Sequence, residues 1–505
     1  MIHITRRAIL GAAGALPFLR IVGARAHAPG TLTFGFSGYP PTLQPWANAG
    51  TSSATVKLMT NRGLLAYDKQ GALRGELATR WAPDGTHAWA FSLRDAVFHN
   101  GEKLTSADVK WTIEQIANEK STAYFRTEMQ GVDAVETPDD KTVRIVMKQP
   151  TVTLPHWLAS YHLPIMSRHS DANQPVGAGP FVLKAQERGV SLDLEAFDKY
   201  YKPGLPKLKS IRVVAYADEN LRVAALQTGD VDLIEYVPWQ SMDGIAKDPK
   251  FVLDAVDGPF MYLVFNGTKP PFDDARVRRA VGHAIKREDI VKAAFFGRGT
   301  SMAHLPIAAG SEFFNADLND GWRYDPALAK KLLAEAGHGD GFTCSFLSTA
   351  QYGMHKDSAE IVQQHLAAVG IQSELNLPDW ATRLAIANKG QYDLAMMGTT
   401  TDSNDPDGLG NLIDGSLSTS YVRSFGLKTP RITELLKAGR AEFDATKRKA
   451  IYHTIEQIAI EEAPIVGLAW RSQGYAMQKT VTGFKNMPGA LTFQSGITLE
   501  ETSVA

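Results

Sequence analysis

Alternation of short apolar runs with amphipathic helices is the feature that most restricts the fold of this chain. The runs "YLVFN", "CSFLS", "YDLAMMG" and "PIVGLAW" each follow or precede a segment with helical spacing of its apolar residues. Such alternation is typical of α/β layer architectures, in which helices cover the faces of a sheet. No internal repeat interrupts the pattern, and Gly and Pro are spread along the chain. We therefore expect an α/β fold with interwoven domains.

Capping residues place three of the helices. Thr105 and Asp108 have the spacing of a capping box before a helix that reaches about residue 120. Asp325 and Pro326 start a second helix, which stops at Gly337. The segment "DARVRRAVGHAIKRED" predicts a third. Apolar residues also alternate in "TLTFGFSG", which predicts a strand with one buried side.

The first 28 residues have the organisation of an export signal. Arg6 and Arg7 precede an apolar stretch from Ala8 to Leu19, which is short of the roughly 20 residues needed to span a bilayer. Ala24 and Ala26 form a small-x-small cleavage pattern. We expect cleavage after Ala26, with residues 1–26 as a signal of the twin-arginine class; a general secretory signal is the alternative.

Charge and cysteine content exclude several classes of protein. Lys and Arg number 53 against 54 Asp and Glu, and no basic run is interleaved with aromatic residues, so nucleic acid is not an expected partner. Cys344 is the single cysteine. It cannot form an internal disulfide, and we expect a buried structural thiol. Because no cysteine follows the signal, we expect a soluble periplasmic protein without a lipid anchor.

Sequence motifs of common enzymes are missing. No GxSxG, HExxH, GxxxxGK[ST] or paired CxxC occurs, so we expect no enzyme, no cofactor and no metal site. The acidic loop "GTTTDSNDPDG" fails as an EF-hand, because Asp407 stands where Gly is required and Ile413 where the bidentate Glu belongs. A secreted hydrolase using the carboxylates of residues 402–407 stays open. Asp405 before Pro406 favours a turn instead.

Several stretches, in order, resemble family 5 of the extracellular solute-binding proteins, the peptide, dipeptide and nickel type that serves ABC importers. They are "LATRWAPDGTHAWAFSLRDAVFHNGEKLTSADVKW", "VGAGPFVL", "DKYYKPGLPKL", "AALQTGDVDLI", "FNGTKPPFDDARVRRAVGHAIKREDIV" and the region from "GIQSEL" to "GTTTDSNDPDG". The resemblance covers nearly the whole chain after the signal.

The resemblance implies a type II periplasmic-binding fold with two lobes, a two-strand hinge and a small inserted domain. By analogy, lobe I takes residues 29–60, 175–262 and the C-terminal part 473–505. The inserted domain takes 61–174, and lobe II takes 263–472. Ligand is expected between the lobes, which close around it.

The resemblance also suggests ligand-binding residues. In peptide-binding relatives an Asp pairs with the ligand ammonium, and Asp402 is the matching position here, beside Thr401. Relatives meet the ligand carboxylate with an Arg, whereas this chain offers His355 or Lys356 at that place, or Arg383 further on. Arg383 is equally well explained as a solvated charge on a helix face. Aromatic residues expected at the cleft are Trp380, Tyr39, Tyr161 and Trp470.

The expected function is a receptor that binds a peptide-like or amino-acid-derived solute and works as a monomer. Its expected partners are an ABC permease, touched at the inner membrane, and ATPase subunits. The ligand could instead be an opine, glutathione, a sugar derivative or a nickel chelate. Nickel is disfavoured because the nickel branch relies on a late histidine, and residues 399–427 contain none.

Overall fold

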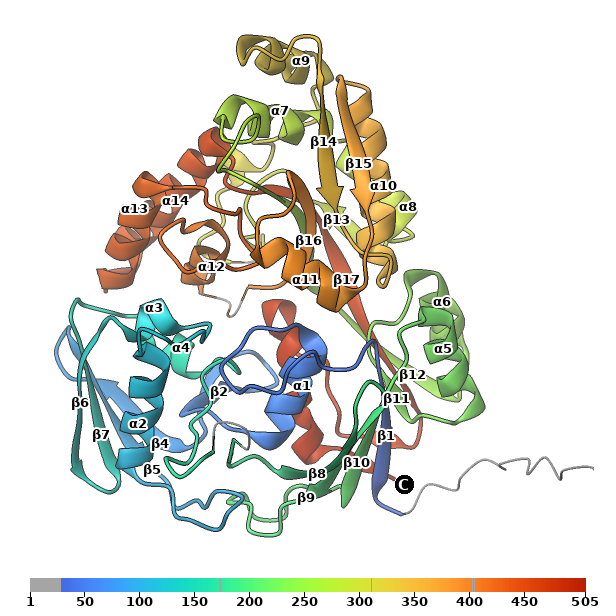
Figure 1. The fold of residues 1–505 in the computed structure, drawn as a ribbon. Helices are drawn as coiled ribbons and strands as arrows, with labels where there is room; N and C mark the ends of the chain where they lie inside the picture. Colours follow the sequence, from blue (N-terminus) through green and yellow to red (C-terminus); the bar gives the residue numbers. More distant parts are fainter. Residues whose placement is uncertain (1–28, 172–174, 310, 402, 404) are drawn as a thin grey trace, which may run out of the picture.

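The structure is a computed structural model that describes residues 29–171, 175–309, 311–401, 403 and 405–505. The expected signal, with Arg6, Arg7, Ala24 and Ala26, lies outside the described residues, as does Asp402. Figure 1 shows an upper lobe, a lower lobe and a smaller body beside the lower lobe. These are called lobe II, lobe I and the inserted domain. The exact residue limits given for them above stay a prediction.

One mixed sheet of eleven strands runs through both lobes. Its spatial order is β15 (Ile371–Asn376), β14 (Phe342–Leu347), β16 (Leu394–Thr399), β12 (Phe251–Phe265), β17 (Val466–Gln478), β11 (Leu233–Ile234), β1 (Thr31–Phe36), β10 (Ser210–Ala215), β9 (Ser191–Ala196) and β8 (Phe181–Glu187), with β13 (Gly299–Ser301) beside β17.

Two long antiparallel strands, β12 and β17, connect the lobes (Figure 1). In lobe I, the end of β17 pairs with β11; in lobe II, the end of β12 pairs with β16. Their mutual register is interrupted between Asp257 and Phe260. A register irregularity bends a strand locally, so the two crossing strands have a built-in bend near the junction of the lobes.

Lobe I packs its helices on the β1 half of the sheet. Leu32, Phe34 and Phe36 are fully buried, as expected, but Thr33 on the opposite face is buried as well. The expectation of one buried side was therefore wrong, because the side chains of Val231, Ile234 and Tyr216 pack over Gly35 on the second face of β1. The remaining elements are α1 (Thr51–Thr60), α5 (Glu219–Thr228), α6 (Trp239–Lys247), the 3-10 helix η3 (Gly489–Glu501), β18 (Val481–Thr482) and β19 (Ser503–Val504).

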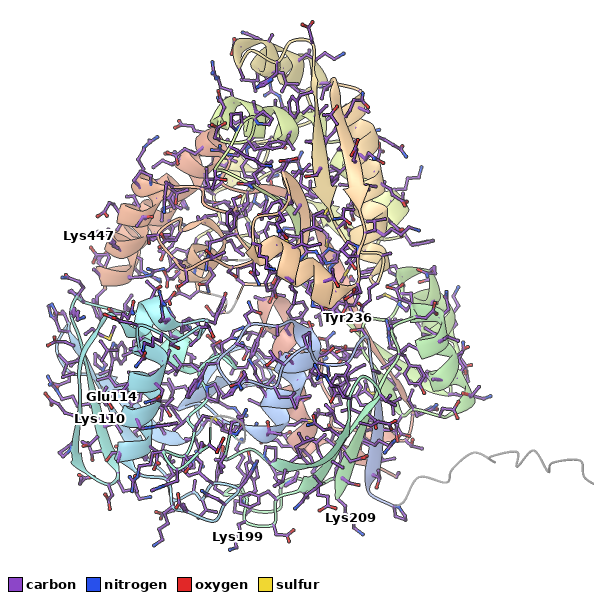
Figure 2. The ribbon with its side chains drawn as sticks, in the orientation of Figure 1. Lys110, Glu114, Lys199, Lys209, Tyr236 and Lys447 are labelled. Atoms are coloured by element: carbon purple, nitrogen blue, oxygen red, sulfur yellow. The ribbon has the colours of Figure 1, made fainter. Side chains whose placement is uncertain are left out.

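The inserted domain has its own four-stranded antiparallel sheet. The predicted capping box of α2 is confirmed, since Thr105 and Asp108 exchange both hydrogen bonds. Lys110 and Glu114 point outward from α2 (Figure 2). Its elements are β2 (Leu65–Tyr67), β3 (Leu73–Gly75), β4 (Ala78–Pro83), β5 (Ala88–Leu93), α2 (Ser106–Ala117), α3 (Arg126–Met129), β6 (Val132–Asp139), β7 (Thr142–Met147) and α4 (Leu154–Leu158).

A buried cluster of paired charges joins the start of the inserted domain to the C-terminus. Arg62 Nε lies 3.1 Å from Glu76 Oε1, and its Nη2 lies 2.8 Å from Glu500 Oε2. Lys202 Nζ lies 2.7 Å from an oxygen of each carboxylate. Tyr200 donates a hydrogen bond to Glu500. We call Arg62, Glu76, Lys202 and Glu500 the paired cluster.

Lobe II contains the predicted helix capped by Asp325, whose side chain accepts from Leu328 N at 2.9 Å. The segment expected as one helix from 273 is two helices, because Arg287 is buried and donates to the carbonyls of Gly282 and Ile285. The elements are α7 (Ala275–Ala284), α8 (Arg287–Ala294), η1 (Ala316–Leu318), α9 (Pro326–Glu335), α10 (Gly353–Ala367), α11 (Trp380–Asn388), η2 (Pro406–Leu409), α12 (Gly410–Ile413), α13 (Pro430–Ala441) and α14 (Ala445–Glu462).

Candidate ligand cavity

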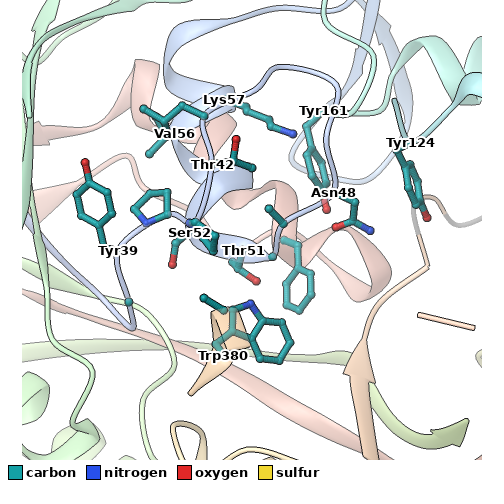
Figure 3. A pocket seen from close by; sticks show the side chains of 18 of the residues that line it. Tyr39, Thr42, Asn48, Thr51, Ser52, Val56, Lys57, Tyr124, Tyr161 and Trp380 are labelled. Atoms are coloured by element: carbon teal, nitrogen blue, oxygen red, sulfur yellow. The ribbon is translucent and has the colours of Figure 1, made fainter. Parts of the chain in front are cut away.

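A cavity of about 1300 Å³ lies between the lobes. Lobe I lines it with the segment after β1 and the start of α1, and the inserted domain adds Tyr124 and Tyr161 (Figure 3). Lobe II lines it with the first residues of α10 and α11 and with the end of β16. A cavity of this size fits a small solute, and its place between the lobes lets both of them contact one ligand.

Trp380 is the centre of an aromatic wall. It is the first residue of α11, whose N-cap Asp379 accepts from Thr382 N. Its ring lies 5.4 Å from Tyr352 and 6.0 Å from Tyr421, both nearly perpendicular to it. Edge-to-face contacts hold aromatic rings in fixed orientations. The wall is therefore preorganised for contact with the flat or apolar part of a ligand.

Gly50 brings the lobe I backbone against this wall. Its φ of +89° is a left-handed value that favours glycine, and an added Cβ would lie 3.2 Å from Trp380 Nε1. Next to it, the Thr51 hydroxyl is 2.8 Å from the Tyr236 hydroxyl. Because Gly50 belongs to lobe I and Trp380 to lobe II, the two lobes approach closely at this edge of the cavity.

Basic groups gather behind the aromatic wall. His355 lines the cavity, and burial, followed by the charges of Arg383 and Arg471, holds its pKa well below the usual value. Arg383 lies 5.0 Å behind the Trp380 ring, and Arg471 lies 5.7 Å from the Tyr236 ring. Both arginines are fully buried. Within the described part of the chain, two guanidinium nitrogens of each and Nδ1 of His355 have no hydrogen-bond partner.

Lys57 of α1 supplies a further basic group at the lobe I wall. Its side chain is 2% exposed, lines the cavity and donates to the Ala47 carbonyl. Burial lowers the pKa of Lys57 to about 7. Among the described residues no carboxylate forms an ion pair with it.

Carboxylates are scarce in this cavity. Of the lining residues that the structure describes, Asp379 alone carries one, and its oxygens already accept from Thr382 N and Oγ1. Lys57 and Arg188 line the same space. Basic side chains with few compensating acids favour a ligand that carries negative charge.

The structure brings five of the predicted site residues to the cavity and leaves others away from it. Those that line it are Tyr39, Tyr161, His355, Trp380 and Thr401.

The other predicted residues lie elsewhere. The reading of Arg383 as a solvated charge is wrong, since it is fully buried behind Trp380. Lys356 is outside the cavity because it turns to the surface beside Glu360, 3.9 Å away. Trp470 is likewise outside because it packs edge-to-face on Phe260. Asp402 lies outside the described residues.

The carboxylates of the acidic loop that are described serve the fold. Asp405 accepts from Asp407 N, as expected of a turn, and pairs with Arg448 at 2.6 Å. Asp407 pairs with Arg440 at 2.7 Å. Neither residue lines the cavity. Two carboxylates held by arginines outside the cavity are poorly placed as the acid and base of a hydrolase.

Sequence reasoning missed Lys57, Asn48, Tyr236, Tyr352 and Tyr421, all at the cavity wall. One signal was available: Lys57 is the sole charged residue of α1, "TSSATVKLMT". The others look like ordinary strand-end and loop residues. Their role depends on which segments meet in space, which the local sequence does not specify.

The described residues hold neither a cluster of metal-ligating side chains nor a helix that could span a membrane. Among the described residues, no group of three or more His, Cys, Asp or Glu side chains is arranged to hold a metal ion. Within the same residues, no helix has the length and apolar character needed to cross a membrane. Cys344 is buried, and burial raises the pKa of its thiol to about 12.

Two lobes joined by crossing strands, with a cavity between them, define a type II periplasmic-binding protein. The profile of the "Bacterial extracellular solute-binding proteins, family 5 Middle" matches residues 72–420. The chain belongs to this family. Proteins of the family bind small solutes and work with the permease and ATPase components of ABC transporters.

Three relatives illustrate the range of ligands. The structure of the periplasmic binding protein AgaA of A. tumefaciens R10 with agropinic acid is 40% identical, has a TM-score of 0.91, and the match covers 94% of this chain and 99% of that one. The glutathione-binding protein GsiB of Salmonella typhi is 28% identical over 88% of this chain and 90% of its own. DppA of Helicobacter pylori with the peptide STSA is 22% identical, has a TM-score of 0.86, and the match covers 94% and 98% of the two chains.

Proposed function

We propose that this protein binds an amino-acid-derived organic acid of the opine type between its lobes and presents it to an ABC permease. The observation that carries the proposal is the charge of the cavity wall. Lys57 and Arg188 line the cavity and Arg383 lies buried behind Trp380, whereas Asp379 is the one carboxylate among the described lining residues. A ligand with acid groups compensates this imbalance, whereas a simple cation would not.

The relatives support the same ligand class. AgaA, bound to agropinic acid, shares 40% of its residues with this chain. The peptide-bound DppA shares 22%, which shows the shared fold alone. Glutathione, the ligand named for GsiB, is also an acid derived from amino acids. We rank an opine-type acid first, glutathione second and a neutral peptide third.

The protein is proposed to bind without turnover. The carboxylates available in the acidic loop, Asp405 and Asp407, are bound by arginines, which leaves them unsuited to proton transfer. Ligand recovered after long incubation should therefore be chemically intact by mass spectrometry. Steady release of a product would support the hydrolase hypothesis instead.

Cellular location and assembly are part of the proposal. We expect a periplasmic monomer without a lipid anchor, exported by the signal in residues 1–26. Replacing Arg6 and Arg7 together by Lys should stop export by a twin-arginine route, which reads the arginine pair, while a general secretory route needs only the charge. Normal periplasmic accumulation of the double variant would assign the general route.

Asp402 is proposed to meet an amine of the ligand, as its position in the family pattern implies. Asp402→Asn keeps the side-chain shape and removes the charge. Binding of an amine-bearing ligand should weaken by about 2–5 kcal/mol, the range for breaking a buried charge pair. An N-acetylated ligand should show little additional loss. Equal losses of affinity for both ligands would show that Asp402 does not contact the ligand amine.

The test of the proposed function is a binding screen with purified protein. Agropinic acid, mannopinic acid, glutathione and a neutral dipeptide are compared by thermal shift and calorimetry. A ligand at 100 times its Kd should stabilise the protein by about 2.7 kcal/mol. We expect the acids to bind and the neutral dipeptide to bind more weakly. Preference for the dipeptide, or binding of no acid, would contradict the proposal.

A further inference from the structure

Lys57 is a buried lysine and the sole charged residue of helix α1. Its ammonium is buried in lobe I, with the Ala47 carbonyl as its hydrogen-bond partner. Taking a lysine out of water costs several kcal/mol unless a negative group compensates it. No such group is present among the described residues around it. The carbonyl bond satisfies one of its three donors.

The surroundings of Lys57 contain basic and phenolic groups. His162 of the inserted domain is close enough for the Lys57 charge to contribute to its lowered pKa, after burial. Both ring nitrogens of His162 lack a hydrogen-bond partner within the described chain. Figure 3 shows the Lys57 side chain reaching toward Tyr161, with Tyr124 and Asn48 in the same region of the cavity. In the loop that precedes α1, residues 37–50, Tyr39 is the one titratable side chain.

From this placement we infer that Lys57 binds an acid group of the ligand, and that ligand binding therefore draws a proton onto Lys57. The inference rests on the proposed function, because it requires an anionic ligand. It assigns the lobe I end of the cavity to one acid group. The basic groups behind Trp380 lie on the lobe II side.

Protonation links this contact to pH. Because burial lowers the pKa of Lys57 to about 7, much of the unliganded protein holds a neutral amine above pH 7. An anion beside the amine favours the charged form and raises its pKa. The complex then holds more protons than the free protein, so affinity decreases as pH rises above 7. Below pH 7 Lys57 is already charged, and affinity is constant while the ligand acid stays ionised.

His162 does not account for such an effect. Its pKa is held well below 6.5 by burial and then by Lys57, so it is neutral across the range in which Lys57 titrates. His355, on the lobe II side, has a lowered pKa for similar reasons. Proton uptake by either histidine would occur at lower pH than uptake by Lys57.

The experiment is calorimetry with agropinic acid in buffers of different ionisation enthalpy, from pH 6 to pH 9. The wild type should take up close to one proton per ligand at pH 8, and its Kd should rise by up to about tenfold per pH unit above 7. Lys57→Met should bind at least about 30-fold more weakly at pH 6, with no uptake at pH 8. Lys199→Met, at an exposed lysine (Figure 2), should match the wild type.

Each outcome has a defined meaning. Binding by the wild type without proton uptake, or uptake that persists in Lys57→Met, overturns the role of Lys57 and leaves the proposed function intact. Binding of none of the acids in the screen overturns both. If Lys57→Met does not fold, Lys57→Gln replaces it, and the wild-type proton uptake decides the question without any variant. A purely structural lysine would leave proton uptake at zero.

Discussion

Two groups of buried charged residues in this molecule differ in their partners. In the paired cluster, Arg62 and Lys202 lie within 3.1 Å of Glu76 and Glu500. Around the cavity, Lys57, His355, Arg383 and Arg471 are equally buried but have no carboxylate partner in the described chain. The contrast indicates that charges paired within the chain hold the fold, while unpaired basic groups at the cavity are available to a ligand.

The largest effect is expected from breaking the paired cluster. Glu500→Gln leaves Arg62 and Lys202 with one buried carboxylate fewer, so the free energy of unfolding should decrease by about 3–5 kcal/mol. Urea denaturation measures this change. Ligand affinity of the folded variant should not change, because the cluster does not line the cavity. Asp193→Asn, at an exposed pair with Arg212, is the control and should change stability by less than about 1 kcal/mol.

The paired cluster also predicts loss of stability in acid. Burial alone would raise the pKa of Glu500, but Arg62 and Lys202 overcome it and hold the pKa far below the ordinary value. A lowered pKa in the folded state gives stability that is present above the unfolded value near 4.5 and lost as pH falls below it.

A second prediction uses the opposite behaviour of Lys57. Its pKa is about 7 in the folded protein, against 10.5 for a lysine in water, so the unfolded chain binds more protons between these values. Stability of the unliganded wild type should therefore rise with pH in this window, by about 2 kcal/mol from pH 7 to pH 9. The measurement is the difference in unfolding free energy between the wild type and Lys57→Met across that range. A difference that does not vary with pH would show that Lys57 keeps its charge.

A third prediction concerns Arg383, which acts from behind Trp380. Arg383→Met should weaken binding of an acid ligand about tenfold, because a charge near the cavity is lost without loss of a direct contact. Stability should stay the same or increase, since a buried charge without a counterion is removed. Calorimetry and urea denaturation of the same variant test both parts. Strong destabilisation would show that Arg383 stabilises the fold, as the paired cluster does.

The smallest effect is expected at Lys356. Its ammonium is exposed and lies 3.9 Å from Glu360 on the surface of α10, so Lys356→Met should change neither affinity nor stability measurably. Comparison with Lys57→Met separates a cavity lysine from a surface lysine. A clear loss of affinity in Lys356→Met would show that Lys356 contacts the ligand, contrary to its place on the surface of α10.

Local signals in the sequence identified elements better than they identified the site. The capping box of α2 and the cap of α9 depend on residues three positions apart, and both are found as expected. The break between α7 and α8 was missed, because it depends on the burial of Arg287 against the distant Trp322 carbonyl. Trp380 could be expected at the cavity from the family pattern.

Charge roles could not be predicted from the sequence in the same way. Arg383 has the spacing of a surface charge, yet α11 packs it against β16, where it donates to Met396 O. Lys57 lies in a short helix whose neighbours come from the loop at Ala47 and from the inserted domain at His162. Whether a basic residue is paired, exposed or left for a ligand is decided by segments far away in the chain.

The paired cluster has a consequence for the order in which the protein is made. Arg62 and Glu500 are separated by 438 positions in the chain, and β11 of lobe I pairs with β17, which begins at Val466. When the first half of the chain has been synthesised, neither Glu500 nor β17 has been made yet. Contacts of such sequence separation form slowly. We therefore expect lobe I to complete its sheet only when synthesis is nearly finished, with the edge of β11 unpaired until then.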